Sequence, residues 1–548
     1  MANLSQQKRE RMIAFLDTLK KKNADDDDTL RAIGEIENEL NSKKYGLVWE
    51  KHEEAVDVKM KDYIPVFTED HEREITAAPG EGYNFLLEGD NLHSLKLLEK
   101  THKGKIDVIY IDPPYNTGDT SFRYDDTYVT KEDGYRHSKW LSFMYERLRI
   151  ARSLLSSEGL IFISIDDHEA PTLTLLCNEI FGEENHVETV IWKNKYGAGA
   201  KTVGFISVHE YILCYSKERI SDLTSELDSE SQAAYKKKDN KYNRRGGYLT
   251  QPLMTQSLGD RPNLMYSIEH NGDTIVPRKQ WVWSKDRLLN AIANDEVEFN
   301  KQKDGTYSVR AKKYLIDENG NMRRGKPLSI LNGPFTQDGT KEIRDIFGSE
   351  DIFKFSKPSE LIRYFISFAV NGHLNKNAIV LDFFAGSGTT AQAVLEQNKR
   401  DGGHRTFILC TNNEDNICET VTYERIKRVI NGYKNKNGIP ANLKYYKTDF
   451  VARDEEYLSD ALLKHITEMI QLENGIKLDG KKYLMILTDE QADDLSAHWD
   501  QYPDVKAIYL SKNVLLTTDQ ETLFDNVPVY IIPDYYFDFE LREEGESW

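Results

Sequence analysis

Residues 105–116 read KIDVIYIDPPYN, an apolar run followed by the turn Asp-Pro-Pro-Tyr-Asn at 112–116. The short apolar run from Ile106 to Ile111 predicts a strand. In an open parallel sheet, ligands bind at the carboxyl ends of the strands. The turn that follows this strand is therefore a candidate site for binding or catalysis.

Short apolar strands alternate with longer amphipathic segments around this turn. The pattern stops after about residue 217 and resumes from about residue 355, which predicts an α/β fold whose sheet is interrupted and then continued. The predicted strands are FLLEGD (85–90), GLIFISID (159–166), AIVLDF (378–383) and RTFILCT (405–411), with helices at 140–155, 359–370 and 389–397.

The turn after the first strand suits activation of an aromatic amine. The lone pair of such an amine is delocalised into the ring, so two acceptors are needed to pull the nitrogen towards tetrahedral geometry. The Asp112 carboxylate and the Pro113 carbonyl supply them, and the two prolines make a rigid rim without N–H donors. Tyr115 offers a ring on which an extruded base can stack. An ordinary surface turn is the alternative, since Pro-Pro pairs are common there.

A second motif, DFFAGSGTT at 382–390, combines a strand end, a glycine turn and a helix start. Glycines let the backbone approach a cofactor closely, and a helix start supplies free N–H groups. The segment from Gly386 to Ala391 also fits the relaxed dinucleotide fingerprint G-x-G-x-x-A, so a nicotinamide cofactor stays open at this point. Asp382 and Phe384 favour a methionine amine and an adenosine ring instead.

Other cofactor classes find little support. Residues 197–202, GAGAKT, lack the glycine directly before lysine and the spacing of a phosphate loop. Cys177, Cys214, Cys410 and Cys418 stand apart without histidine clusters, so no metal site is expected and a reducing cytoplasm fits. No apolar run approaches the roughly 18 to 20 residues of a membrane span, and the polar start lacks a signal peptide, so no membrane association is expected.

Charge is distributed unevenly along the chain. The net charge is -19, which on its face argues against binding to nucleic acid, yet residues 231–345 hold 21 Lys or Arg and 14 Asp or Glu, a local excess of +7. This segment interleaves basic residues with aromatic ones, a pattern typical of nucleic-acid contact. Solvated loop charges are the alternative, and we expect Trp281 and Trp283 to form a private core there.

The order of the two motifs, DPPY before FAGSG, resembles the beta class of amino-methyltransferases, in which a circular permutation puts the catalytic half before the cofactor half. Further segments are similar to the modification subunits of type III restriction-modification systems, over roughly Phe85 to Val451. They are EGDNLHSLKLL (88–98), KWLSFMYERLRIARSLLSSEGLIFISIDDHE (139–169), EIFGEENHVETVIWK (179–193), HEYILCYSK (209–217), FSKPSELI (355–362) and LKYYKTDFV (443–451).

The resemblance implies methyl transfer from S-adenosylmethionine to adenine N6 in double-stranded DNA by base flipping. The catalytic residues would be Asp112, Pro113, Pro114 and Tyr115. Lys357 and Pro358 would lie beneath the methionine end of the cofactor, and Asp90 near its adenine. The full set implied to hold the cofactor is Asp382, Phe384, Ala385, Gly386, Gly388, Thr389, Asp90, Asn116, Lys357, Pro358 and Glu414. Glu414 would hold the ribose, although TNNED departs from a tidy strand-ending acid.

The implied fold is a Rossmann-like S-adenosylmethionine-dependent methyltransferase sheet, circularly permuted. Its expected parts are an N-terminal helical arm (1–80), the catalytic half (81–217), an inserted target recognition domain (218–350), the cofactor half (351–434) and a C-terminal αβ domain (435–548). The implied partners are double-stranded DNA, a second copy of the chain, and a separate restriction subunit with helicase and nuclease activity, because this chain has neither a convincing Walker loop nor a nuclease signature.

Two alternatives remain open within this interpretation. The chain could recognise DNA for a partner nuclease and methylate little or not at all, but an intact Asp112 argues against that. The target could instead be cytosine N4, or RNA. Cytosine enzymes more often carry serine in place of Asp112, so the sequence favours adenine.

Overall fold

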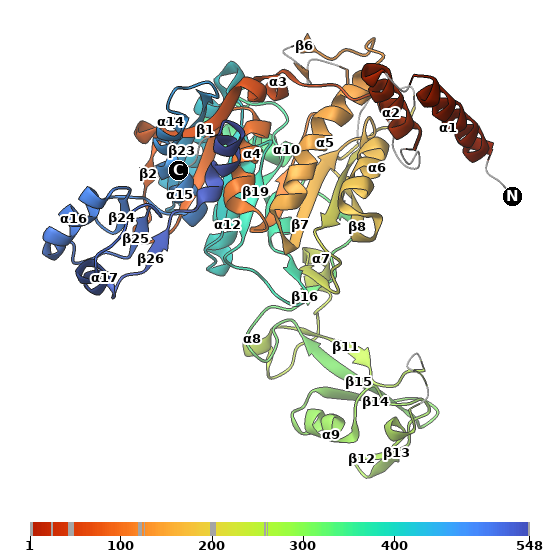
Figure 1. Cartoon of the computed structure of the whole chain (residues 1–548). Helices are drawn as coiled ribbons and strands as arrows, with labels where there is room; N and C mark the ends of the chain where they lie inside the picture. The colour runs from red at the N-terminus through yellow and green to blue at the C-terminus, as the bar shows by residue number, and fades with distance from the viewer. Residues whose placement is uncertain are drawn as a thin grey trace.

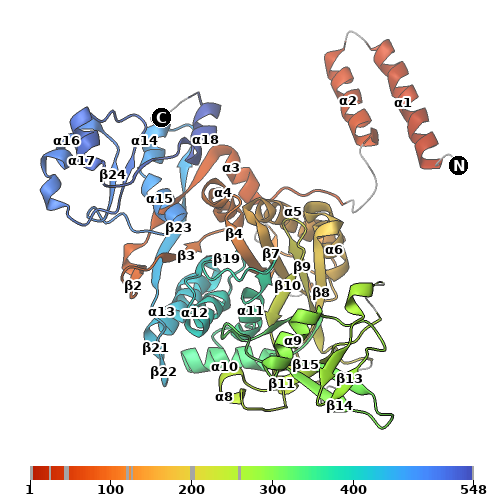
Figure 2. The same ribbon diagram turned by 90° about the horizontal axis from the view of Figure 1, so that it is seen from below.

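The computed structural model describes residues 4–23, 26–41, 49–118, 123–124, 127–197, 204–256, 259 and 261–545. Most of these residues form one α/β body (Figure 1). A lobe built from the middle of the chain extends from one end of the body, and a small αβ unit from the C-terminal region extends from its side. Figure 2 shows a two-helix hairpin at the N-terminus that stands apart from the body.

An 11-stranded sheet forms the centre of the body, in the order β1-β23-β3-β20-β19-β4-β7-β9-β8-β17 with β2 paired to β23. The strands from β23 to β7 are parallel, and β9 is antiparallel to both β7 and β8. The strands are β1 (Tyr63–Glu69), β2 (Ile75–Thr76), β3 (Tyr83–Glu88), β4 (Ile106–Ile111), β7 (Leu155–Ile165), β8 (His186–Lys193), β9 (His209–Ser216), β17 (Ile330–Asn332), β19 (Ile379–Asp382), β20 (Thr406–Thr411) and β23 (Asn442–Ala452).

The permuted α/β fold is confirmed by this order. The central strand β19 comes late in the chain, between β20 and β4, whereas β3, β4, β7, β8 and β9 all precede the lobe. The chain thus builds one half of the sheet, leaves it, and returns to complete the middle.

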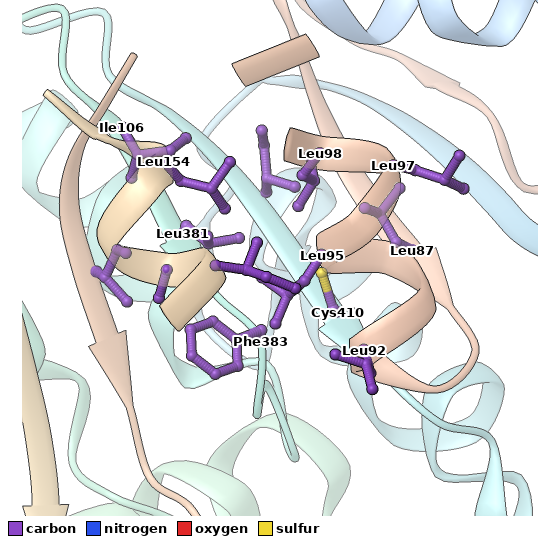
Figure 3. Packing of buried hydrophobic residues seen from close by; sticks show 14 of the residues in the cluster. Leu87, Leu92, Leu95, Leu97, Leu98, Ile106, Leu154, Leu381, Phe383 and Cys410 are labelled. Atoms are coloured by element: carbon purple, nitrogen blue, oxygen red, sulfur yellow. The ribbon is translucent and has the colours of Figure 1, made fainter. Parts of the chain in front are cut away.

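Helices cover both faces of the sheet. One face carries α4 (Asn91–His102), α5 (Arg136–Leu154), α6 (Ala170–Phe181) and α15 (Ile466–Asn474), and the other carries α11 (Ser359–Ile366), α12 (Thr389–Asp401) and α13 (Glu424–Asn431). Because side chains alternate along a strand, Leu87 packs into the first core and Leu86 into the second. Figure 3 shows the leucines of α4 packed against Leu87, Leu381, Phe383 and Cys410. None of the described helices combines the length and the apolar character that crossing a bilayer requires.

The middle lobe is narrower than the expected recognition domain. It begins after β10 (Leu223–Glu226) and ends at β16 (Arg324–Gly325), and these two strands pair with each other. Residues beyond β16 return to the body, because β17 joins the main sheet beside β8 and α10 (Thr336–Phe347) contacts α13. The lobe proper is therefore residues 227–323, not 218–350.

A small sheet of order β11-β15-β14 and the helix α9 (Lys285–Ala293) build the lobe. Trp281 is fully buried in its core and Trp283 packs against it, which confirms the expected private core. The lobe's main strands are β11 (Tyr248–Pro252), β14 (Val297–Lys301) and β15 (Tyr307–Tyr314), with the smaller elements α7 (Ser229–Ala233), α8 (Tyr242–Arg245), β12 (Ile268–His270) and β13 (Asp273–Ile275).

The terminal boundaries also differ from the expected ones. Only α1 (Leu4–Lys22) and α2 (Asp27–Asn41) form a separate hairpin, whereas α3 (Ala55–Asp62) and β1 belong to the body. At the other end, β23 pairs with β3, so the body continues through α14 (Leu458–Leu463) and α15. An unpaired edge of β3 would expose its backbone polar groups, and β23 satisfies them.

The C-terminal unit contains a parallel sheet of order β24-β25-β26 with an apolar core of its own, and Ala507 and Tyr509 of β25 also pack into the core of the body. Its elements are β24 (Tyr483–Ile486), α16 (Asp489–Ala497), β25 (Ala507–Leu510), α17 (Thr518–Phe524) and β26 (Val529–Ile531), and the chain then returns to the body in α18 (Asp538–Glu543). The remaining short strands are β5 (Arg123–Tyr124), β6 (Thr127–Tyr128), β18 (Ala369–Val370), β21 (Gly432–Tyr433) and β22 (Lys436–Asn437).

A buried arginine joins the N-terminal segment to the sheet. Arg147 of α5 has no exposed surface and donates to both oxygens of Glu54, at 2.7 and 3.1 Å. Its Nε donates to the Asn91 side chain at 2.6 Å, and Asn91 in turn donates to the backbone carbonyl of Phe383 at 2.7 Å. One side chain therefore links residue 54, α4 and the strand end that leads into the glycine turn.

We expect Arg147→Ala to lower the free energy of unfolding by about 3 to 5 kcal/mol, because the Glu54 carboxylate would stay buried without its partner. Arg149→Ala in the same helix is the control. Its side chain is 46% exposed and pairs with Glu146, whose side chain is 36% exposed. An exposed ion pair of this kind contributes about 0 to 1 kcal/mol. Calorimetric unfolding of both variants measures the difference, and equal losses would contradict the role given to Arg147.

Candidate active site

The two motifs meet at one edge of the sheet. Strand β4 leads into the turn at 112–116 and β19 leads into the glycine turn, and the two strands are parallel neighbours with Val108 opposite Val380 and Ile109 opposite Leu381. Their carboxyl ends therefore open on the same side. That edge is where an open parallel sheet binds its ligands.

Four polar side chains form a connected cluster around Asp112. The Nζ of Lys357 lies 2.8 and 2.9 Å from the two Asp112 oxygens and 2.8 Å from the Tyr115 hydroxyl. The Tyr115 hydroxyl contacts Oδ1 of Asp112 at 2.9 Å and Oε2 of Glu210 at 3.0 Å. Lys357 also lies 3.5 Å from Glu210, and Asn194 donates to the other Glu210 oxygen at 2.7 Å. One ammonium is thus shared by two carboxylates.

The electrostatics of the cluster follow from burial and from this sharing. Burial raises the pKa of Asp112, and the Lys357 ammonium opposes that rise. Burial alone would lower the pKa of Lys357, but the Asp112 and Glu210 carboxylates outweigh it and raise that pKa. The lysine therefore stays charged and favours the ionised form of Asp112, the form that accepts hydrogen bonds with both oxygens.

The loop that carries Asp112 is fixed from two sides. The Trp140 indole donates to the carbonyl of Pro114 at 2.7 Å. Asn116 is buried with a positive φ of 56°, and its amide donates to Glu169 at 2.6 Å and to the Arg136 carbonyl at 3.2 Å. We expected Asn116 to contact the cofactor, and the structure places its amide nitrogen in the anchor of the loop. Its Oδ1 is buried without a hydrogen-bond partner among the described residues.

The glycine turn has the backbone that its sequence predicts. Gly386 and Gly388 have φ values of 49° and 76°, in the left-handed region that favours glycine. A Cβ on Gly388 would lie 3.2 Å from the Thr422 side chain, and one on Gly386 would lie 3.4 Å from the ring of Phe353. The Ala385 N–H donates to the Cys410 carbonyl at 3.1 Å, and Thr389 begins α12 directly after the turn.

Asp382 holds this turn from within. It is 4% exposed, and its oxygens accept from the Phe384 N–H at 3.0 Å and from the Thr390 hydroxyl at 2.5 Å. Burial raises the pKa of Asp382 to about 7. We expected this carboxylate to face a methionine amine, whereas both oxygens are engaged inside the turn. Phe384 is partly buried, with its ring centroid 5.8 Å from that of Phe143.

Lys357 and Pro358 both lie close to the two motifs, but their contacts differ. We expected both beneath the methionine end of a cofactor. The Lys357 side chain reaches Asp112 on the turn after β4, whereas buried Pro358 precedes the first residue of α11 as its N-cap. The same segment therefore links the half of the sheet that carries Asp112 to the half that carries the glycine turn.

Asp90 and Glu414 lie at the ends of two further strands. Asp90 caps α4 by accepting from the Leu92 N–H at 2.8 Å, and it lies 3.4 Å from Arg147. Glu414 is exposed at the start of a short 3-10 helix after β20. Both positions are at the carboxyl edge, so roles in holding an adenine and a ribose stay predictions.

Sequence reasoning missed the buried Arg425, which fastens the glycine turn. Its guanidinium donates to Ser387 at 3.0 Å, to Thr389 at 2.8 Å and to Ser356 at 3.1 Å, and it pairs with Glu342 at 2.9 Å. The side chain is fully buried. Arg425 lies in an ordinary-looking charged helix, ERIKRVIN, where no local signal separates a buried arginine from a surface one. Glu210 was likewise not predicted as a site residue, because it lies within the strand segment HEYILCYSK without a local signal of its own.

One further cluster has ligand atoms close enough to hold a metal ion. Glu69, His71 and Glu74 bring theirs within 4.8 Å of one another. The Lys444 ammonium already lies 2.6 Å from Glu69 and 3.9 Å from Glu74. A protein cation therefore neutralises this cluster.

Three curated relatives share long stretches of this sequence. The Mod subunit of the type III restriction-modification enzyme StyLTI from Salmonella typhimurium is 33% identical, over 67% of this chain and 60% of its own length. The type II methyltransferase M.KpnI from Klebsiella pneumoniae is 34% identical, over 59% of this chain and 79% of its own. The Mod subunit of EcoP15I from Escherichia coli is 28% identical, over 86% of this chain and 80% of its own.

A family model described as DNA methylase, for N6 and N4 methyltransferases, matches residues 106–424. This range begins at β4, includes the lobe, and ends beyond the glycine turn. It therefore contains both motifs and the cluster of Asp112, Tyr115, Glu210 and Lys357. The chain belongs to the DNA methylase family.

Proposed function

We propose that this protein transfers a methyl group from S-adenosylmethionine to the N6 amine of an adenine flipped out of double-stranded DNA. The observation that carries the proposal is the position of Asp112 and Tyr115. They lie on a rigid turn at the carboxyl end of β4, beside the glycine turn that follows β19.

The turn would activate the amine through two acceptors. Asp112 accepts one amine hydrogen and the Pro113 carbonyl accepts the other, which localises the nitrogen lone pair. Trp140 donates to the neighbouring Pro114 carbonyl at 2.7 Å and so fixes the direction of the rim. The ring of Tyr115 supports the extruded base by stacking. After transfer the nitrogen carries a positive charge, which the ionised Asp112 stabilises until a proton leaves.

The residues of the glycine turn fit the proposed cofactor, which when bound supplies the electrophilic methyl group. Gly386 and Gly388 keep the turn free of side chains, and the partly buried Phe384 and Phe353 add aromatic surface beside it. The start of α12 supplies N–H groups. Asp382 accepts from the backbone N–H of Phe384, and Arg425 donates to the side chains of Ser387 and Thr389, so both residues hold the turn in place.

The proposed function also assigns roles to the lobe and to partner chains. Residues 227–323 would read the DNA sequence, because they form a separate unit within a basic stretch of the chain. The similarity to type III Mod subunits supports a role as the modification and recognition subunit of such a system in the cytoplasm. A restriction subunit and a second copy of the chain would be its partners.

The base and its sequence context can be tested directly. Genomic DNA from cells with and without the gene, sequenced for modified bases, should differ in N6-methyladenine at one short sequence. N4-methylcytosine at a defined site would instead support the cytosine alternative. Binding of that sequence without any methylation would support a recognition module.

We expect Asp112→Asn to slow methyl transfer about a hundredfold or more, because the negative charge facing the developing positive charge is lost. Affinity for DNA and for S-adenosylmethionine should change little. Asp167→Asn is the control, since this exposed carboxylate follows β7 at the same edge of the sheet. Incorporation of labelled methyl groups into duplex DNA measures the rates. Near-normal turnover of the Asp112 variant would refute the catalytic assignment.

We expect Gly386→Val to abolish binding of S-adenosylmethionine. A β-branched residue resists a φ of 49°, and its side chain enters the space beside the Phe353 ring. Gly134→Val is the matched control, because a Cβ there meets no atom within 4 Å. Titration calorimetry compares the two variants with the wild type. Tight binding of NAD by the wild type would favour the nicotinamide alternative.

Exchanging residues 227–323 for the lobe of a relative should make the chimaera methylate the sequence that the relative methylates. An active chimaera that still marks the original sequence would place recognition elsewhere.

Within the lobe, replacing the exposed Lys236 with glutamine should weaken binding to all DNA sequences and reduce the salt dependence of binding by about one charge. Lys237→Gln is the control, because its ammonium lies 2.6 Å from Glu298 and is already neutralised.

A further inference from the structure

Glu210 brings a second carboxylate to the edge where Asp112 lies. It is near the start of β9, and because β9 is antiparallel to β7, its start lies where β4 and β7 end. The side chain is 16% exposed. Its Oε2 lies 3.0 Å from the Tyr115 hydroxyl and 3.5 Å from Lys357, while Asn194 holds its Oε1 at 2.7 Å.

The position of Lys357 presents a chemical conflict. Its ammonium contacts both Asp112 oxygens, at 2.8 and 2.9 Å, and so favours the ionised carboxylate. The same contact neutralises that carboxylate. An acceptor that is neutralised by a close cation stabilises the positive charge developing on a methylated amine less well. The lysine therefore helps Asp112 before the base enters and opposes it during transfer.

We propose that Glu210 is a positioning residue that takes the Lys357 ammonium from Asp112 when an adenine amine binds there. This inference rests on the proposed function. Glu210 is already 3.5 Å from the ammonium and shares the Tyr115 hydroxyl with Asp112. The flexible four-carbon stem of lysine allows a short shift of the ammonium between the two carboxylates. Asn194 keeps the receiving carboxylate in place throughout.

The test uses the full-length protein, S-adenosylmethionine and an unmethylated duplex. The duplex contains the sequence that this protein modifies in genomic DNA. Glu210→Gln should lower the single-turnover rate of methyl transfer ten- to a hundredfold at neutral pH, with KM values for both substrates changed less than threefold. Glu210→Asp should recover part of the rate. Glu188→Gln is the control, because this exposed glutamate lies on the adjacent strand β8 of the same sheet.

A double variant separates positioning from a structural role. If Glu210 acts by receiving Lys357, the loss caused by Glu210→Gln should largely disappear when Lys357→Met removes the ammonium. The two variants together should then be no slower than Lys357→Met alone. Losses that multiply would overturn the proposal.

The dependence of the rate on pH gives a second signature. Lys357, Glu210 and Tyr115 face Asp112, and Tyr110 and Asp382 lie close enough to interact with it from β4 and β19. Glu210→Gln removes a like charge, so the pKa of Asp112 should fall. The acid limb of the rate–pH profile should then move to lower pH, although the maximal rate is also lower. Lys357→Met removes the cation that lowers the pKa of Asp112, so the acid limb should move to higher pH. An unshifted acid limb in both variants would overturn the proposal.

The controls also distinguish this inference from the proposed function. A wild-type protein that transfers no methyl group to DNA would refute the function itself. An active wild type with an equally fast Glu210→Gln variant would refute only the inference.

Discussion

The pairing of β4 with β19 is the contact on which the site depends. Each strand ends in one of the two motifs, and these motifs lie in parts of the chain separated by the whole lobe. A parallel pair places both carboxyl ends at one edge, so the turn with Asp112 and the glycine turn face a common space. Lys357 then reaches across from the cofactor half to Asp112 in the catalytic half. The proposed active site thus forms only when the segment that follows the lobe has joined the sheet.

Buried cations hold this arrangement together, and each one serves several acceptors. Arg147 connects Glu54 with Asn91, and Arg425 connects the glycine turn with Ser356 and Glu342. Burying a guanidinium is unfavourable unless its donors are satisfied, so these residues fix geometry more than they add stability. Lys357 differs because its two carboxylates compete for one ammonium. A residue with alternative partners can change position at little free-energy cost, which suits a cation that lies against the proposed catalytic carboxylate.

The sequence predicted the elements whose signals are local. Strand β4 has the predicted bounds, Ile106 to Ile111, and the glycine turn has the positive φ values that its glycines imply. Strands β1 and β23 were placed outside the body because their membership of the sheet depends on pairing with distant segments and not on their own residues. Glu210 and Arg425 depend on contacts with distant segments, so a single sequence could not distinguish them from surface charges. Lys357 was noticed, but its link to Asp112 exists only in three dimensions.

Under the proposed function, the way in which the lobe is attached explains how recognition of the DNA sequence can be independent of methyl transfer. The chain leaves the body along β10 and returns along β16, and these strands pair with each other, so the lobe is inserted at a narrow neck. Its core around Trp281 shares no residue with the two cores of the body. Substitutions inside the lobe therefore change its surface without disturbing the packing that positions β4 and β19. The proposed recognition surface can therefore vary while the Asp112 turn, the glycine turn and the shared lysine stay the same.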